Sequence, residues 1–212
     1  ITANTANWST SKTITIKAAN SNYSNIRYTT NGTIPTSTTG TAIANGGTFT
    51  ITGNCTIIAV AFDSTGQAGS AATNTVKTID RENPVVTEAT ASTNNVRIKA
   101  TDNASGIVGY AVTTSTTAPT EFTKCDSTKA LDVTIPNLKQ GTTYYAWVKD
   151  AAGNVSASKS TDTGKVTSLS ITANTANWST SKTITIKAAN SNYSNIRYTT
   201  NGTIPTSTTG TK

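Results

Sequence analysis

Short runs in which apolar and polar residues alternate, separated by turn-forming residues, recur along this chain of 212 residues. The segment TITIKA at 13–18 places Ile14, Ile16 and Ala18 on one side and polar residues on the other. Alternation with a period of two is typical of a half-buried β-strand, and no sustained helical period competes with it. The chain is therefore expected to be all-β, with many short strands.

The same alternation predicts further strands at 25–30, 48–52, 55–70, 96–100, 109–114, 131–135 and 143–158. The segments 55–70 and 143–158 share one plan, a strand followed by an Asp-x-x-Gly turn and a returning strand. This similarity indicates two related domains that meet near Asn83-Pro84, where a proline cannot donate to a ladder. Seven or so short strands in each domain favour β-sandwiches.

Two segments resemble known families. LKQGTTYYAWV at 138–148 resembles the fibronectin type III and bacterial immunoglobulin-like pattern. The resemblance implies that Tyr144 is a corner tyrosine whose hydroxyl returns to nearby backbone, and that Ala146 and Val148 face the core. IRYTTNGTIPT at 26–36 is similar to the sandwich module at the C-terminus of chitobiase-type enzymes, with Asn31 where that family usually has Asp.

An exact internal repeat sets the domain organisation, because residues 171–211 repeat residues 1–41 without a substitution. We expect tandem immunoglobulin-like or fibronectin III-like sandwiches at 1–82 and 83–170, and a partial copy of the first domain at 171–212. An alternating array resists strand exchange between identical neighbours. The partial copy is interpreted as the edge of a longer array, as a connector to a neighbouring molecule, or as a loosely folded segment.

Composition argues against several function classes. The net charge is +7, but the basic residues are scattered and few aromatic residues accompany them, so no nucleic-acid partner is expected. No apolar run approaches the ~18 residues of a membrane span. The chain has no histidine, and no nucleophile elbow or phosphate-binding loop is present. We therefore expect no enzymatic activity.

Four acidic residues are candidate calcium ligands, namely Asp80, Glu82, Asp102 and Asp150. In an immunoglobulin-like sandwich the loops that carry Asp102 and Asp150 share one end, and the linker brings Asp80 and Glu82 to it. Calcium takes six to eight oxygen ligands from such groups. The alternative is that these residues only form turns, and no other cofactor is expected.

The two cysteines, Cys55 and Cys125, lie one in each domain. They could not form a bridge within a domain. Two interpretations stay open: free or buried thiols, or a disulfide between domains or between neighbouring molecules in an extracellular fibre.

Two strands are apolar on both faces. If Ile57 and Ala59 face the core, the neighbouring apolar residues on the same strand face outward, and the corresponding long strand of the second domain shows the same pattern. The outward set is Ile58, Val60, Phe62, Tyr145 and Trp147. A sheet exposed to water usually carries polar residues there. The set is interpreted as covered by the chain itself, as a surface for lateral packing, or as an aromatic platform for a sugar.

The predicted function is that of a structural repeat in an extracellular, bacterial cell-surface protein. It would act as a stalk or spacer, with copies of itself or neighbouring repeats as partners, and would assemble into a fibre or lattice. The alternative is a glycan-binding module of an adhesin or of a secreted polysaccharide-degrading enzyme, with cell-surface glycans as partners and Tyr145 and Trp147 as the platform.

Overall fold

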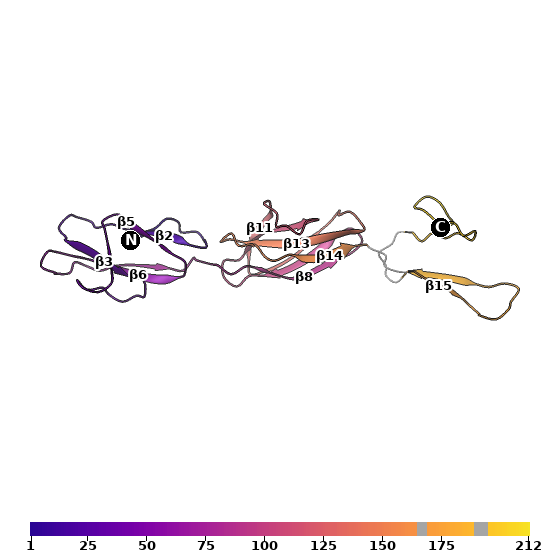
Figure 1. The fold of residues 1–212 in the computed structure, drawn as a ribbon, viewed down its shortest axis with the longest axis horizontal. Helices are drawn as coiled ribbons and strands as arrows, with labels where there is room; N and C mark the ends of the chain where they lie inside the picture. Colours follow the sequence, from indigo (N-terminus) through magenta and orange to yellow (C-terminus); the bar gives the residue numbers. More distant parts are fainter. Residues whose placement is uncertain (165–168, 189–194) are drawn as a thin grey trace.

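The computed structural model describes residues 1–164, 169–188 and 195–212. Its strands pair into antiparallel sheets that form two β-sandwiches in series, followed by a separate hairpin (Figure 1). The all-β prediction is confirmed. The predicted domains 83–170 and 171–212 include residues 165–168 and 189–194, which lie outside the described residues. Within the described part of the chain, no helix has the length and apolarity needed to cross a membrane.

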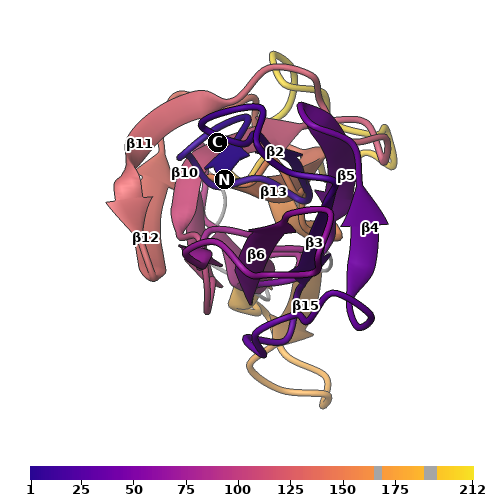
Figure 2. The same cartoon turned by 90° about the vertical axis from the view of Figure 1, so that its left-hand side faces the viewer.

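The first sandwich packs a three-stranded sheet, in the order β1-β2-β5, against a four-stranded sheet, in the order β4-β3-β6-β7. Its strands are β1 (Thr2–Ala3), β2 (Lys12–Ile16), β3 (Asn25–Thr29), β4 (Thr41–Ile43), β5 (Gly47–Ile51), β6 (Cys55–Phe62) and β7 (Ala72–Val76). The end-on view shows β2 and β5 in one layer, and β3 and β6 in the other (Figure 2). The alternating residues Ile14, Ile16 and Ile57 fill the space between these layers, together with Ile26.

The second sandwich repeats this arrangement with a three-stranded sheet, β12-β9-β8, and a four-stranded sheet, β11-β10-β13-β14. Its strands are β8 (Val85–Ala91), β9 (Val96–Thr101), β10 (Ile107–Thr113), β11 (Thr123–Thr128), β12 (Ala130–Ile135), β13 (Thr142–Asp150) and β14 (Lys159–Thr163). Val96, Ile98, Ile107 and Val148 lie at the centre of a core that shares no residue with the core of the first sandwich. Each sandwich therefore has its own core.

The last described strands are β15 (Leu169–Ala173) and β16 (Ile184–Ala188), which pair only with each other. Their register places Thr172 opposite Thr185, and Ala173 opposite Ile184. Several of their apolar side chains are exposed, and Ile184 keeps 53% of its surface accessible. This hairpin reproduces the pairing of β1 with β2, but it lacks the sheet that covers that pair in the first sandwich.

Local details of the sequence prediction are also confirmed. Tyr144, Ala146 and Val148 belong to the second core, and the Tyr144 hydroxyl accepts a hydrogen bond from the Lys139 amide at 3.0 Å. The structure adds β8 and β11, which the alternation pattern did not identify. In β11, Thr, Lys, Cys, Asp and Ser residues alternate too weakly in polarity to predict a strand.

Candidate functional site

Three acidic side chains meet where the linker enters the second sandwich. Asp80 comes from the linker after β7, Asp102 directly follows β9, and Asp150 ends β13. All three residues are buried, and one carboxylate oxygen from each lies within 4.8 Å of the others. The loops that follow β9 and β13 meet at the same end of the sandwich, so residues distant in the sequence become neighbours.

Backbone amides orient each carboxylate. Asp80 accepts hydrogen bonds from the amides of Glu82 (3.0 Å) and Ser105 (2.9 Å). Asp102 accepts from the amides of residues 104 and 106, at 3.0 and 2.6 Å. Asp150 accepts from the amide of Asn154 at 2.7 Å and from its side-chain Nδ2 at 2.7 Å. Except for the bond from Ser105, which reaches Asp80 from another segment, these are turn contacts, as the alternative interpretation of the sequence predicted, and the same turns bring three carboxylates together.

The protonation equilibria of the cluster differ from residue to residue. Burial raises the pKa of Asp150, and the nearby charge of Asp80 raises it further against the hydrogen bonds from Asn154. Burial also opposes the charged form of Asp80, but the Ser105 hydroxyl and amide, the Glu82 amide and the charge of Lys129 together hold its pKa below the ordinary value. The cluster therefore concentrates negative charge in a site shielded from water.

Glu82, the fourth predicted ligand, does not join the cluster. Its side chain is exposed, and only its amide reaches Asp80. The prediction is wrong for Glu82, because its exposed side chain is not among the carboxylates that the structure brings together. Sequence reasoning missed Ser105 instead. Ser105 is buried, and its hydroxyl lies beside Asp80 without a hydrogen bond of ordinary geometry.

No basic side chain forms an ion pair with the cluster within the part of the chain that is described. The two ion pairs found there, Arg97 with Asp132 and Lys99 with Glu88, lie on the surface of the second sandwich. Lys129 is exposed and donates to the carbonyl of Ala104, not to a carboxylate.

The two cysteines are free thiols. Cys55 packs against the first core and Cys125 against the second, and burial raises the pKa of both thiols. Because each thiol lies beside a different core, the predicted disulfide between domains of one chain is not formed. A bridge between neighbouring molecules stays a prediction.

The outward residues of β6 and β13 do not form an exposed apolar surface. Val60 (2% exposed), Phe62 (3%) and Trp147 (5%) are buried although none belongs to a core cluster, whereas Ile58 and Tyr145 are half-buried. The prediction of an exposed packing or sugar-binding surface is therefore wrong for the three buried residues.

The chain itself provides this cover, since these side chains are buried within a single molecule. In the first sandwich, the segment after β6 turns back, and the Gly69 amide donates to the Ala61 carbonyl at 2.9 Å. In the second, the Phe122 ring lies 5.8 Å from Lys149 Nζ on the outer side of β13, and the Trp147 indole donates to Thr113 Oγ1. The sequence interpretation that the chain covers its own outer faces is the one the structure supports.

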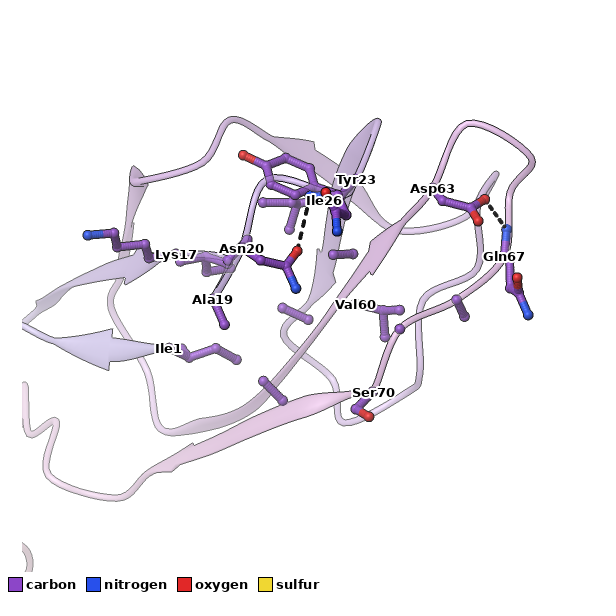
Figure 3. Close-up of a pocket in the computed structure, with 18 residues that line it drawn as sticks. Ile1, Lys17, Ala19, Asn20, Tyr23, Ile26, Val60, Asp63, Gln67 and Ser70 are labelled. Atoms are coloured by element: carbon purple, nitrogen blue, oxygen red, sulfur yellow. Dashed lines mark hydrogen bonds between the residues drawn. The ribbon is translucent and has the colours of Figure 1, made fainter.

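A pocket of about 580 Å³ opens at the edge of the first sandwich (Figure 3). Ile1, Ala19 and Val60 lie around its opening, and Asp63 and Gln67 lie at one end. Asp63 Oδ1 already accepts hydrogen bonds from Thr65 and from the Gln67 amide. The lining is mostly aliphatic and amide, and its other polar side chains are Lys17, Tyr23, Asp63 and Ser70.

Comparison with known proteins identifies relatives of the fold. Residues 14–76, from β2 to β7, match the family described as Fn3 associated. This match covers less than half of the chain. The fibronectin(III)-like modules of CbhA from Clostridium thermocellum share 17% identity with the chain at a TM-score of 0.38. That alignment covers 75% of this chain and 90% of the CbhA chain. No curated protein matches the chain. The family match therefore supports the similarity to fibronectin III-associated modules over residues 14–76 of the first sandwich.

Proposed function

We propose that this chain is a non-catalytic spacer segment of an extracellular bacterial surface protein, in which alternating sandwiches hold other parts at a defined separation. The supporting observation is the junction between the two sandwiches. A spacer needs its domains to keep one relative orientation, because a loose linker allows domains to move independently. The match of residues 14–76 to the Fn3-associated family agrees with a module of this kind.

The linker is bonded on both sides. On the side of the first sandwich, Asn54 donates to the Ile79 carbonyl at 3.1 Å and accepts from the Ile79 amide at 2.8 Å. The Asp80 amide donates to the Ser9 carbonyl at 3.0 Å. On the side of the second sandwich, the Asp80 carboxylate accepts from Ser105, and its carbonyl accepts from Asn154 Nδ2. Successive linker residues are thus held from both directions.

The glycan-binding alternative loses its predicted platform. Trp147 is buried and its indole nitrogen is bonded to Thr113, so its ring is not free to stack on a sugar. The resemblance of the first sandwich to chitobiase-type modules would place this chain within a polysaccharide-degrading enzyme. However, the aromatic residue of β6, Phe62, is buried and is not available to bind a sugar.

The spacer proposal is tested by measuring the distance between the sandwiches. Spin labels at Ser64 and Thr116, both exposed, would be introduced into a chain whose native cysteines are replaced by alanine. We expect one narrow distance distribution by electron–electron double resonance. Asn54→Ala should broaden it, because the linker loses its two bonds to the first sandwich.

A matched control is Asn74→Ala, which removes one side-chain hydrogen bond to Ile1 in the same sandwich, away from the linker. This variant should leave the distribution narrow. A broad distribution in the parent protein would refute the spacer function. Binding of a soluble polysaccharide by the parent protein, lost on Trp147→Ala without a loss of fold, would favour the glycan-binding alternative.

A further inference from the structure

We propose that Asp80, Asp102 and Asp150, together with the Ser105 hydroxyl, bind a calcium ion at the junction of the two sandwiches. This inference goes beyond the spacer function and does not depend on it, since a module can bind calcium whatever its role.

The first argument is uncompensated charge. The three aspartates are 3%, 4% and 1% exposed, and oxygens of all three lie within 4.8 Å of one another. Burial of charged groups is costly unless they are paired or coordinate a metal. Within the described residues no ion pair reaches the cluster, and Lys129, whose charge acts on Asp80, is exposed and donates to the Ala104 carbonyl. A divalent cation would compensate this charge.

The second argument comes from the equivalent turn in the first sandwich. Asp63 begins the same kind of turn as Asp150: its amide donates to the Gln67 carbonyl, and its carboxylate accepts from the Gln67 amide at 2.9 Å. Asp150 makes the same two contacts with Asn154. The Asp63 turn forms with a single, half-buried carboxylate. The turn alone therefore does not require two further buried carboxylates beside Asp150.

The third argument is an unpaired hydroxyl. Ser105 is 95% buried, and among the described residues its Oγ has no hydrogen-bond partner of ordinary geometry, although the Ser105 amide donates to Asp80 Oδ2. Buried polar atoms are normally satisfied by a protein group, water or an ion. Because the amide of this same residue donates to Asp80 Oδ2 at 2.9 Å, the Ser105 hydroxyl adds a neutral oxygen donor close to the Asp80 carboxylate.

The donor set selects calcium. All candidate ligands are oxygens, since the chain has no histidine and neither cysteine belongs to the cluster, so the softer nitrogen and sulfur ligands preferred by zinc are missing from it. Six N–H groups occupy the three carboxylates, whereas each carboxylate offers about four lone-pair sites. Enough acceptor sites remain for an ion that tolerates irregular geometry. Magnesium demands a near-ideal octahedron and retains its waters, which a buried cluster accommodates poorly.

The position of the ion would tie the linker to the second sandwich. Asp80 contributes its carboxylate to the cluster while its amide is bonded to Ser9 in the first sandwich. Asp150 ends β13 in one sheet of the second sandwich, and Asp102 directly follows β9 in the other. One ion would thus contact ligands from the linker and from both layers of the domain that follows.

The test is a calcium titration of the full chain after treatment with a chelator. Isothermal titration calorimetry should detect one site per chain. Scanning calorimetry should show a rise in Tm of about 10 °C or more when calcium is in hundredfold excess over its Kd. Magnesium at the same concentration should produce a much smaller rise.

Two variants separate the site from the turns. Asp102→Asn keeps an oxygen that can accept from the amides of Ala104 and Gly106 but removes one charge. It should abolish calcium binding, and without calcium it should melt at a higher temperature than the parent protein, because repulsion in the cluster is relieved. The control Asp63→Asn changes an equivalent turn outside the cluster and should bind calcium like the parent protein.

The inference would be overturned by the absence of heat and of a Tm shift in the parent protein up to about 10 mM calcium, which exceeds the Kd of weak extracellular sites. An equal calcium response in Asp102→Asn would also overturn it, and an equal response to magnesium would refute the assignment to calcium. Calorimetry measures calcium binding, whereas the spin-label distances measure how rigidly the two sandwiches are held relative to each other. The two proposals can therefore fail separately.

Discussion

Lys12 is a buried lysine whose charged form is disfavoured by its burial. It begins β2 with 1% of its surface exposed, and its Nζ donates only to backbone carbonyls, those of Thr5 at 3.0 Å and Asn7 at 2.6 Å. Burial lowers its pKa from 10.5. A lysine at the edge of an alternating run is expected to extend into solvent, so the sequence did not predict this burial.

This burial predicts a pH dependence of stability. Between the lowered pKa of the folded state and 10.5, the unfolded chain binds a proton at Lys12 that the folded chain has released. The free energy of unfolding should therefore rise with pH through this window and lose that contribution as the pH falls below it. Urea denaturation at a series of pH values would show the rise in the parent protein and its reduction in Lys12→Met.

The exposed Lys17 provides the comparison for this experiment. Lys17→Met should retain the pH dependence of the parent protein. Identical slopes for Lys12→Met and the parent protein would mean that Lys12 Nζ stays hydrated, contrary to the structure.

At the scale of the strand, the exact repeat gives a direct comparison between two copies of one sequence. Ile14 in β2 is fully buried between the sheets of the first sandwich, whereas Ile184 in β16, its copy, is 53% exposed. The side chains and their sequence neighbours are identical. Only the strands that pack over them differ.

We expect Ile14→Ala to lower the free energy of unfolding by about 2–5 kcal/mol, because it leaves a cavity in a packed core. The same change at Ile184 should cost less than about 0.5 kcal/mol, as surface substitutions usually do. Chemical denaturation of the two full-length variants measures the difference. Equal losses would show that β16 is covered by an apolar surface.

Strand alternation also explains which site predictions failed. The pattern in β6 and β13 correctly separated Ile57 and Val148, which belong to the cores, from Val60 and Trp147, which do not. It could not reveal that both outward residues are buried. Alternation identifies the side of a strand on which a residue lies, whereas its exposure depends on loops from elsewhere in the chain.

At the scale of the whole molecule, the two complete sandwiches should protect the chain from proteolysis, whereas the final hairpin should not. A hairpin of two strands is marginally stable by itself. Lys12 and Lys182 occupy identical local sequences, but Lys12 is buried and Lys182 is exposed. Limited trypsin digestion followed by mass spectrometry should detect cleavage after Lys182 well before cleavage after Lys12. Cleavage after both at the same rate would contradict this expectation.

The acidic cluster illustrates a site that was only partly predictable. The resemblance to immunoglobulin-like sandwiches brought the loops of Asp102 and Asp150 to one end, and the position of the linker added Asp80. The same argument included Glu82, whose side chain turns away, and omitted Ser105, whose hydroxyl is buried at the cluster. Topology predicts which loops meet, but the direction of each side chain follows from the backbone of each turn.

The repeated segment separates what the sequence determined by itself from what only the tertiary structure decided. Both copies share the strand register, since Thr2 pairs with Thr15 as Thr172 pairs with Thr185. In the next segment, Arg27 donates to the Gly40 carbonyl at 2.9 Å, as Arg197 does to Gly210. These contacts recur because each needs only residues within the repeated segment.

Burial does not recur. Trp8 is half-buried, but its copy Trp178 is fully exposed at 104%. Ile14 lies opposite Phe49 of β5, whereas the described pairing of Ile184 in β16 is with Ala173 of β15. The sequence by itself therefore determined strands, turns and local register, because short-range hydrogen bonds require only neighbouring residues. The tertiary structure decided which of these residues form a core, because removing apolar surface from water requires a second sheet to cover it.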